Sequence, residues 1–270
     1  MRLPVIALLT DFGEEDWFVG SLKAVILTLN PRATIVDISH QIPAFDVGAA
    51  GFVLFAASRY FPKGTVFLTV VDPGVGTARK IILVETARYF FIAPDNGVLN
   101  LALAREKVKQ VRQVTDSRFF LRRPSRTFEA RDKMAPVAAW LSLGQKAESF
   151  GPKLRRYVKK AFPQPEFVGD EIRGRILYAD KFGNLITNIP ASAVQAVRTS
   201  KSAKRLSLFV NATWAGGFKE SYASARKGEL FFLVGSLGLV EIAARESSAF
   251  KRLKPKPRAV VRIAGVGLKD

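Results

Sequence analysis

Short apolar runs alternate with helical patterns in the first hundred residues. Residues 5–10 form a continuous apolar run that ends at Asp11, which predicts a buried strand. Apolar positions then recur at helical spacing up to Leu29, with Asp16 as a candidate N-cap and Pro31 as a stop. The run and the helical segment together indicate a strand followed by a helix.

The same alternation continues toward residue 92. In chain order, the pattern predicts a strand at 34–38, a helix at 46–61, a strand at 65–71, and two strands around a turn at 81–85 and 89–92. Strands that alternate with helices are typical of α/β domains, whose helices cover the faces of the sheet. We therefore expect an α/β N-terminal domain with a mainly parallel sheet.

The pattern changes near residue 160. Two prolines within residues 161–166 interrupt it, so we place a linker at 161–169, between domains at 1–160 and 170–270. Short strands are expected in the second domain, at 172–179, 186–189, 206–210, 230–234 and 239–242. Regular short strands with glycine-rich turns predict a small all-β barrel or sandwich.

The composition excludes several kinds of site. The 270 residues are 48% hydrophobic and 24% charged, which is typical of a folded globular chain. There is no cysteine, and His40 is the single histidine, so thiolate metal sites, cysteine nucleophiles and sites that need two histidines are excluded. We expect no metal and no cofactor, and we expect His40, at the end of a strand, to hydrogen-bond locally.

The net charge of +19 is confined to the later part of the chain. Residues 1–100 carry 8 basic and 9 acidic side chains, whereas residues 101–270 carry 34 and 14, with dense basic clusters at 153–160 and 251–258. Such clusters bind nucleic acid or anionic surfaces in some proteins, and form a solvated basic face in others. We favour the solvated face, because the clusters lack a recognisable readout motif.

Membrane segments are not expected. No stretch approaches the ~20 apolar residues of a membrane span, and the first apolar run is too short for a signal peptide. We therefore predict a cytoplasmic protein with no membrane partner.

Polar loops follow three of the predicted strands. Asp11, His40 and the glycine-rich segment 72–76 lie where the carboxyl ends of parallel strands hold ligands. The Asp11 carboxylate can accept two hydrogen bonds from a ribose diol, or it can cap the following helix. The glycine-rich segment lacks the spacing and the lysine of a phosphate loop. Asp72 and Arg79 are expected to form an ion pair across this segment.

Six motifs occur in a specific order along almost the whole chain. They are Leu9–Gly13, Val36–His40, Val70–Arg79, Ala93–Gly97, Asp180–Ile189 and Gly235–Ala243. Together they resemble the S-adenosylmethionine hydroxide adenosyltransferases, which hydrolyse S-adenosylmethionine to adenosine and are related to fluorinating and chlorinating enzymes.

This resemblance implies an architecture and a reaction. It implies an α/β N-terminal domain, a β-barrel C-terminal domain, and a homotrimer whose sites lie between one subunit's N-terminal domain and a neighbour's C-terminal domain. It also implies attack by water or hydroxide on the ribose 5′ carbon. Because a sulfonium leaves as a neutral thioether, the protein needs to position an oxygen nucleophile and accept its proton, without a metal.

The implied catalytic residues include one departure from the family. The family's Asp–Arg–His group falls on Asp72, Arg79 and position 129, where the family's His-Gly is replaced by Glu129-Ala130. Glu129 is a candidate proton acceptor, and the alternative is a plain salt bridge to Arg79 or Arg131. Two carboxylates beside one arginine repel each other, so we expect one pKa to be raised and a proton to be shared.

The resemblance also implies which residues contact the substrate. The alternative is that these residues are ordinary turn or core residues. They are Asp11 and Phe45 at the ribose, Asp180 and Ser236 at the methionine amino and carboxylate ends, and Phe182, Tyr222 and Asn184 at the adenine. Leu237 stands where the halogenating relatives carry arginine.

Two alternative functions stay open. A 5′-halogenase of the same fold is disfavoured, because the halogenating relatives lack the residues matching Asp72 and Arg79, and a buried carboxylate repels halide. A non-catalytic protein that binds S-adenosylmethionine, adenosine or nucleic acid is favoured by the replaced histidine. Substrate turnover distinguishes it from an enzyme.

Overall fold

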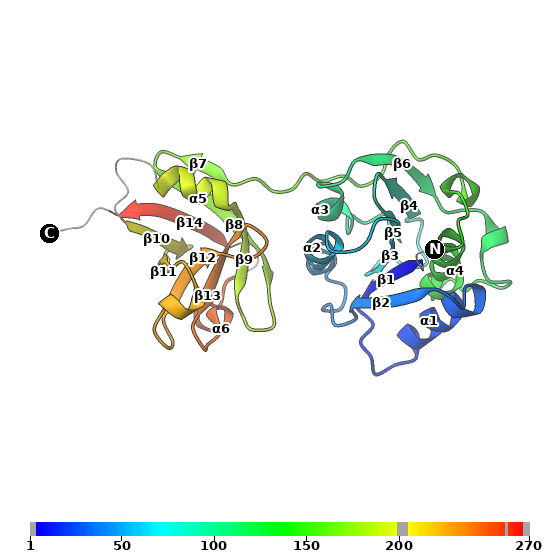
Figure 1. Cartoon of the computed structure of the whole chain (residues 1–270), viewed down its shortest axis with the longest axis horizontal. Helices are drawn as coiled ribbons and strands as arrows, with labels where there is room; N and C mark the ends of the chain where they lie inside the picture. The colour runs from blue at the N-terminus through cyan, green and yellow to red at the C-terminus, as the bar shows by residue number, and fades with distance from the viewer. Residues whose placement is uncertain (1–3, 199–204, 257–258, 267–270) are drawn as a thin grey trace. The chain divides into compact units, whose positions relative to one another are not determined.

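The computed structural model describes residues 4–198, 205–256 and 259–266. The chain divides into two compact units, Met1–Phe162 and Pro163–Asp270 (Figure 1). The division falls inside the range expected for the linker, and residues 166–168 of that range form a short strand.

A six-stranded sheet forms the centre of the first unit. Its strand order is β2-β1-β3-β5-β4-β6. The strands are β1 (Val5–Thr10), β2 (Thr34–Ser39), β3 (Val66–Val70), β4 (Ile81–Thr86), β5 (Phe90–Pro94) and β6 (Val108–Gln113). Neighbours from β2 to β5 are parallel, whereas β4 is antiparallel to both β5 and β6. The sheet is therefore mixed, and the expectation of a mainly parallel sheet is corrected.

The connection between β4 and β5 gives the physical reason. The Thr86 N–H donates to the Tyr89 carbonyl at 2.9 Å, which closes a tight turn. A tight turn reverses the chain, whereas a parallel neighbour needs a longer crossover, usually through a helix.

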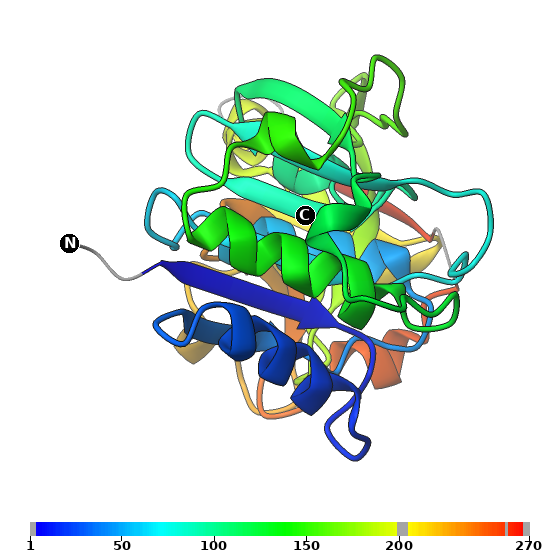
Figure 2. The ribbon, with the colours of Figure 1, turned by 90° about the vertical axis from the view of Figure 1, so that its right-hand side faces the viewer.

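Helices cover both faces of this sheet (Figures 1 and 2). On one face lie α1 (Phe18–Leu29) and α4 (Ala135–Ser142), and on the other lie α2 (Val47–Ser58) and α3 (Asn100–Leu103). Strand β1 is buried between the two layers, which explains why its apolar run is continuous. The predicted Asp16 cap is wrong, because Trp17 is the N-cap of α1 and no side chain caps that helix.

The second unit is a closed barrel. Seven strands follow the order β14-β10-β11-β12-β13-β9-β8, β8 pairs back to β14, and β7 extends the sheet beside β8. The strands are β7 (Glu166–Val168), β8 (Glu171–Ala179), β9 (Leu185–Pro190), β10 (Arg205–Val210), β11 (Thr213–Phe218), β12 (Leu230–Val234), β13 (Leu239–Ala244) and β14 (Val260–Val266). Short helices α5 (Ala191–Arg198) and α6 (Ala249–Leu253) complete the unit. The predicted small all-β barrel is confirmed.

Within the described ranges, no helix is both long and apolar enough to cross a membrane.

Candidate functional site

A pocket of about 290 Å³ opens in the first unit, where β1, β2 and β3 end. Its lining residues come from the loops after these strands, from α1 and from residues 127–130: Asp11, Phe12, Phe18, Ala44, Phe45, Val70, Asp72, Val75, Thr127, Phe128, Glu129 and Ala130. Four residues that the sequence proposes for the site, Asp11, Phe45, Asp72 and Glu129, therefore line one pocket.

Asp11 holds the loop that carries Phe45. The Phe45 N–H donates to Asp11 Oδ2 at 2.8 Å. Phe45 has a φ of 66°, a left-handed conformation that is costly for a bulky side chain, and its ring is 70% exposed. Asp11 makes no capping hydrogen bond to α1, so the helix-cap interpretation is wrong.

Three phenylalanine rings form an apolar wall of the pocket. Phe12, Phe18 and Phe128 contact one another, with ring centroids 5.5, 5.3 and 5.9 Å apart for the pairs 12–18, 18–128 and 12–128. Phe12 and Phe18 were not proposed for the site from the sequence. The pocket therefore has both an apolar part, formed by these rings, and a polar part, formed by its carboxylates.

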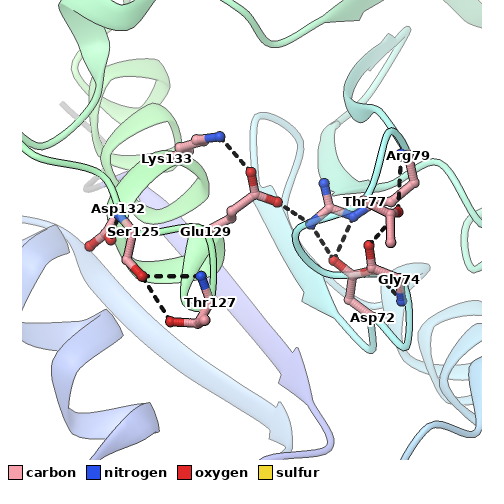
Figure 3. A network of polar contacts seen from close by, with 9 residues as sticks. All are labelled: Asp72, Gly74, Thr77, Arg79, Ser125, Thr127, Glu129, Asp132 and Lys133. Carbon is pink, nitrogen blue, oxygen red and sulfur yellow. Dashed lines mark hydrogen bonds and ion pairs between the residues drawn. The ribbon is translucent and has the colours of Figure 1, made fainter.

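An ion network lies at the polar side of the pocket (Figure 3). The expected ion pair is present: Arg79 Nε donates to Asp72 Oδ2 at 2.7 Å, and Arg79 Nη2 lies 2.5 Å from the same oxygen. Arg79 Nη2 also donates to Glu129 Oε2, and Lys133 Nζ donates to Glu129 Oε1. The four side chains form a row of alternating charges, mostly shielded from solvent.

Lys133 changes the electrostatics expected for this group. Burial favours the neutral acid, but the hydrogen bond from Lys133 and the charge of Arg79 outweigh burial and lower the pKa of Glu129. The expectation of mutual repulsion is therefore corrected for Glu129. Burial also acts to lower the pKa of Arg79, yet Asp72 and Glu129 raise it overall. Two cations neutralise two carboxylates.

Glu129 is the N-cap of a single π-helical turn, Ala130–Met134, which leads into α4. The Ala135 N–H donates to the Ala130 carbonyl, five residues back. Pro136 has no N–H, so the Asp132 carbonyl instead accepts the Leu121 N–H at 2.9 Å. Such π turns are frequent at functional sites.

Asp132 fixes the loop before this turn. It is 1% exposed, and its Oδ2 accepts the Ser125 N–H at 2.6 Å. Its Oδ1 accepts Arg131 Nε at 2.6 Å, so Arg131 pairs with Asp132 and not with Glu129. The loop over residues 121–127 is thereby tied to the turn that presents Glu129.

The glycine-rich loop packs against that segment. Gly76 has a φ of +77°, and a Cβ at this position lies 2.9 Å from the Arg126 carbonyl oxygen. Thr77 Oγ1 donates to the Gly74 carbonyl at 2.7 Å and accepts the Arg79 N–H at 3.3 Å (Figure 3). This loop therefore holds Arg79 between the two carboxylates.

A second polar cluster lies in the barrel unit. The Asp180 carboxylate accepts the N–H groups of Phe182 and Asn184 at 2.9 and 2.8 Å, and the Asn184 side-chain amide at 2.9 Å. The Tyr222 hydroxyl donates to Glu241 Oε1. Phe182 is 69% exposed and Tyr222 is 45% exposed, so both rings present faces to solvent.

Glu241 is the residue of this cluster that sequence reasoning missed. It lies in the motif 235–243, and a Cβ on Gly235 would lie 2.6 Å from Glu241 Oε2, which places the Gly235-Ser236 turn beside the carboxylate. Burial and the negative charge of Asp180 raise the pKa of Glu241, although the Tyr222 hydrogen bond acts in the other direction. The pKa of Tyr222 is raised, mainly by burial and then by the hydrogen bond to Glu241 and the negative charge of that residue.

Other expectations concern His40 and metals. His40 is 2% exposed, and its Nδ1 is hydrogen-bonded to Thr10 Oγ1 at 2.8 Å, which confirms its local role. In the part of the chain that the structure describes, no three histidine, cysteine or acidic side chains gather in a way that suits a metal ion.

Both units match family models. Residues 6–151 match the SAM hydroxide adenosyltransferase N-terminal domain, and residues 174–262 match the C-terminal domain of the same name. The chain belongs to the SAM hydroxide adenosyltransferase family. The resemblance seen in the six ordered motifs is thereby confirmed.

Named relatives of this family member include hydrolases and a halogenating enzyme. It is 32% identical to the (R)-S-adenosyl-L-methionine hydrolase of Thermus thermophilus, over 94% of this chain and 97% of the relative. It is 36% identical to the (R)-S-adenosyl-L-methionine hydrolase of Methanocaldococcus jannaschii, over 71% of this chain and 69% of that relative. A fluorinase of Actinoplanes sp. is 30% identical over 213 residues, which cover 69% of this chain and 72% of the fluorinase.

A solved structure has the same fold. An uncharacterized conserved protein from Thermotoga maritima superposes with a TM-score of 0.89 and 35% sequence identity, covering 96% of this chain and 99% of that protein.

Proposed function

We propose that this protein hydrolyses S-adenosyl-L-methionine to adenosine and L-methionine. The observation that carries the proposal is the ion network of Asp72, Arg79 and Glu129 at the edge of a pocket that also holds Asp11. Relatives named as (R)-S-adenosyl-L-methionine hydrolases support it, because the similarity extends over most of the chain.

The reaction needs one proton acceptor and accurate alignment. A water oxygen forms a bond to the ribose 5′ carbon as the bond between that carbon and sulfur breaks. The sulfur keeps the electron pair and leaves as the neutral thioether of methionine. The proton released by water passes to a carboxylate of the network, either Asp72 or Glu129, while Arg79 orients both.

Substrate contacts follow from the same proposal. Asp11 binds the ribose hydroxyls beside Phe45, and the barrel contributes the remaining groups. Those groups are Asp180 and Ser236 for the methionine ends, and Phe182, Tyr222 and Asn184 for the adenine. Exposed aromatic faces such as those of Phe182 and Tyr222 suit a flat purine.

We further propose a homotrimer, in which the barrel of a neighbouring subunit completes each site. No cofactor takes part in this scheme, and nucleic acid is not a proposed partner. The cytoplasmic location expected from the sequence stays a prediction.

A halogenase is the second candidate, because fluorinases are among the relatives. Three carboxylates line the pocket, those of Asp11, Asp72 and Glu129, and only two cations pair with them, so the remaining negative charge disfavours a bound halide. Incubation of the pure protein with S-adenosylmethionine, with and without chloride, separates the candidates. We expect adenosine and methionine in both samples. A 5′-chlorinated nucleoside identifies a halogenase, and binding without any product identifies a binding protein.

A further inference from the structure

We infer that Lys133 is a positioning residue, which holds Glu129 as an ionised anchor for Arg79 and leaves Asp72 as the proton acceptor. The inference rests on the proposed hydrolase function. It assigns different roles to the two carboxylates that the reaction scheme leaves equivalent.

The hydrogen bonds distinguish the two carboxylates. Each oxygen of Glu129 accepts from a cation, Oε1 from Lys133 and Oε2 from Arg79. In Asp72, Arg79 donates only to Oδ2, and Oδ1 accepts the Gly74 N–H at 3.2 Å. Asp72 lines the pocket and keeps one oxygen without a cationic donor, whereas protonation of either oxygen of Glu129 would weaken a hydrogen bond from a cation.

Lys133 is placed for this role by the π turn. It lies four residues after Glu129, and its side chain is 24% exposed, with its ammonium 5.8 Å from the centroid of the Phe120 ring. The nearest acidic neighbour in sequence, Asp132, is already paired with Arg131. In the described part of the chain, Glu129 is the one carboxylate within ion-pair distance of Lys133.

Without Lys133, one arginine would face two carboxylates. Their repulsion would then raise a pKa, and the two groups would share a proton. Lys133 thus replaces that coupled titration with a balanced row of charges. The lysine acts through Glu129 and Arg79, and not on the substrate itself.

The test is the pH dependence of kcat/KM for S-adenosylmethionine from about pH 3 to about pH 9 in the wild type, Lys133→Met and Lys133→Arg, a range that includes the ordinary carboxyl pKa of about 4. We expect the acid limb of Lys133→Met to move upward by about 1 unit, so that activity on that limb falls about tenfold. Activity at alkaline pH and KM should stay close to wild type, and Lys133→Arg should restore the profile. An unshifted acid limb in Lys133→Met would overturn the inference.

A matched control removes another ion-paired lysine. Lys109 lies 3.1 Å from Glu85 and does not line the pocket, so Lys109→Met should leave the profile unchanged. An equal shift in Lys109→Met would show that the effect is a general one of charge, and would contradict a positioning role.

A second readout does not depend on turnover. The lowered pKa of Glu129 stabilises the fold above the ordinary carboxyl range, and this stabilisation is lost as pH falls through the folded-state pKa. The melting-temperature difference between wild type and Lys133→Met should therefore be present at pH ~7 and shrink on acidification. A difference independent of pH would reject the positioning role of Lys133 even if the wild type is inactive. An inactive wild type with a shrinking difference would instead reject the proposed hydrolysis, and with it Asp72 as the proton acceptor, but not the ion pair that holds Glu129 ionised.

Discussion

Glu129 of the first unit is buried and Glu241 of the barrel is partly buried, and their pKa values shift in opposite directions. Two cations surround Glu129 and lower its pKa. Glu241 instead accepts from the neutral Tyr222 hydroxyl and lies near Asp180, and its pKa is raised. In the described ranges no lysine or arginine forms an ion pair with Asp180 or Glu241, although the whole chain carries +19.

The two polar sites therefore differ in whether cations of the protein balance their carboxylates. In the first unit the charges are balanced before any ligand binds, so the network is already oriented for its chemistry. In the described part of the barrel, Asp180 and Glu241 form no ion pair with a lysine or an arginine, although other carboxylates of this unit do. Under the proposed function, the positive charges of S-adenosylmethionine supply the missing partner.

The largest expected effect comes from removing the proton acceptor. Asp72→Asn keeps the size of the side chain but removes the base, so kcat should fall by about 10²–10⁴-fold, with a small change in KM. Steady-state kinetics with S-adenosylmethionine measure both constants. Asp116→Asn is the control, because Asp116 forms an ion pair with Arg118 away from the pocket. Turnover in Asp72→Asn close to wild type would show that Asp72 does not accept the proton.

A smaller effect should distinguish the two glutamates by stability. Glu129→Gln leaves Lys133 without its anion, so the free energy of unfolding at neutral pH should fall by about 1–3 kcal/mol. The loss should diminish as pH falls through the folded-state pKa of Glu129, because that pKa is depressed.

Glu241→Gln should behave in the opposite way. The raised pKa of Glu241 means that its ionisation opposes folding, so stability contributed by this group is lost as pH rises above its ordinary carboxyl range. The variant should therefore be as stable as wild type or more stable at neutral pH. Urea unfolding of both variants at two pH values tests the contrast, and equal losses of stability would contradict it.

The sequence predicted those parts of the site that depend on local order along the chain. The Asp72–Arg79 pair spans one loop, and Asp11 follows a strand whose apolar run is unmistakable. The roles of Lys133 and Glu241 depend on tertiary contacts. Lys133 reads as an ordinary charged position, and Glu241 alternates with apolar neighbours as a solvent-facing strand residue does.

The fold shows the same limit. The buried runs of β1 and β3 identify their strands, because burial on both faces leaves few polar positions. The direction of β4 depends on whether a turn or a crossover joins it to β5. The spacing of apolar residues does not distinguish these two connections. Strand β6 lies at the sheet edge, and four of its six residues are polar, so its apolar signal is weak.

The most direct test of the central claim is turnover of S-adenosylmethionine in ¹⁸O-enriched water, with mass spectrometry of the products. Attack of water on the ribose 5′ carbon predicts adenosine that carries the label in its 5′ hydroxyl, together with unlabelled methionine. Label in an amino-acid product, with release of a thioether nucleoside, would place the attack on the methionine side of the sulfur and contradict the account.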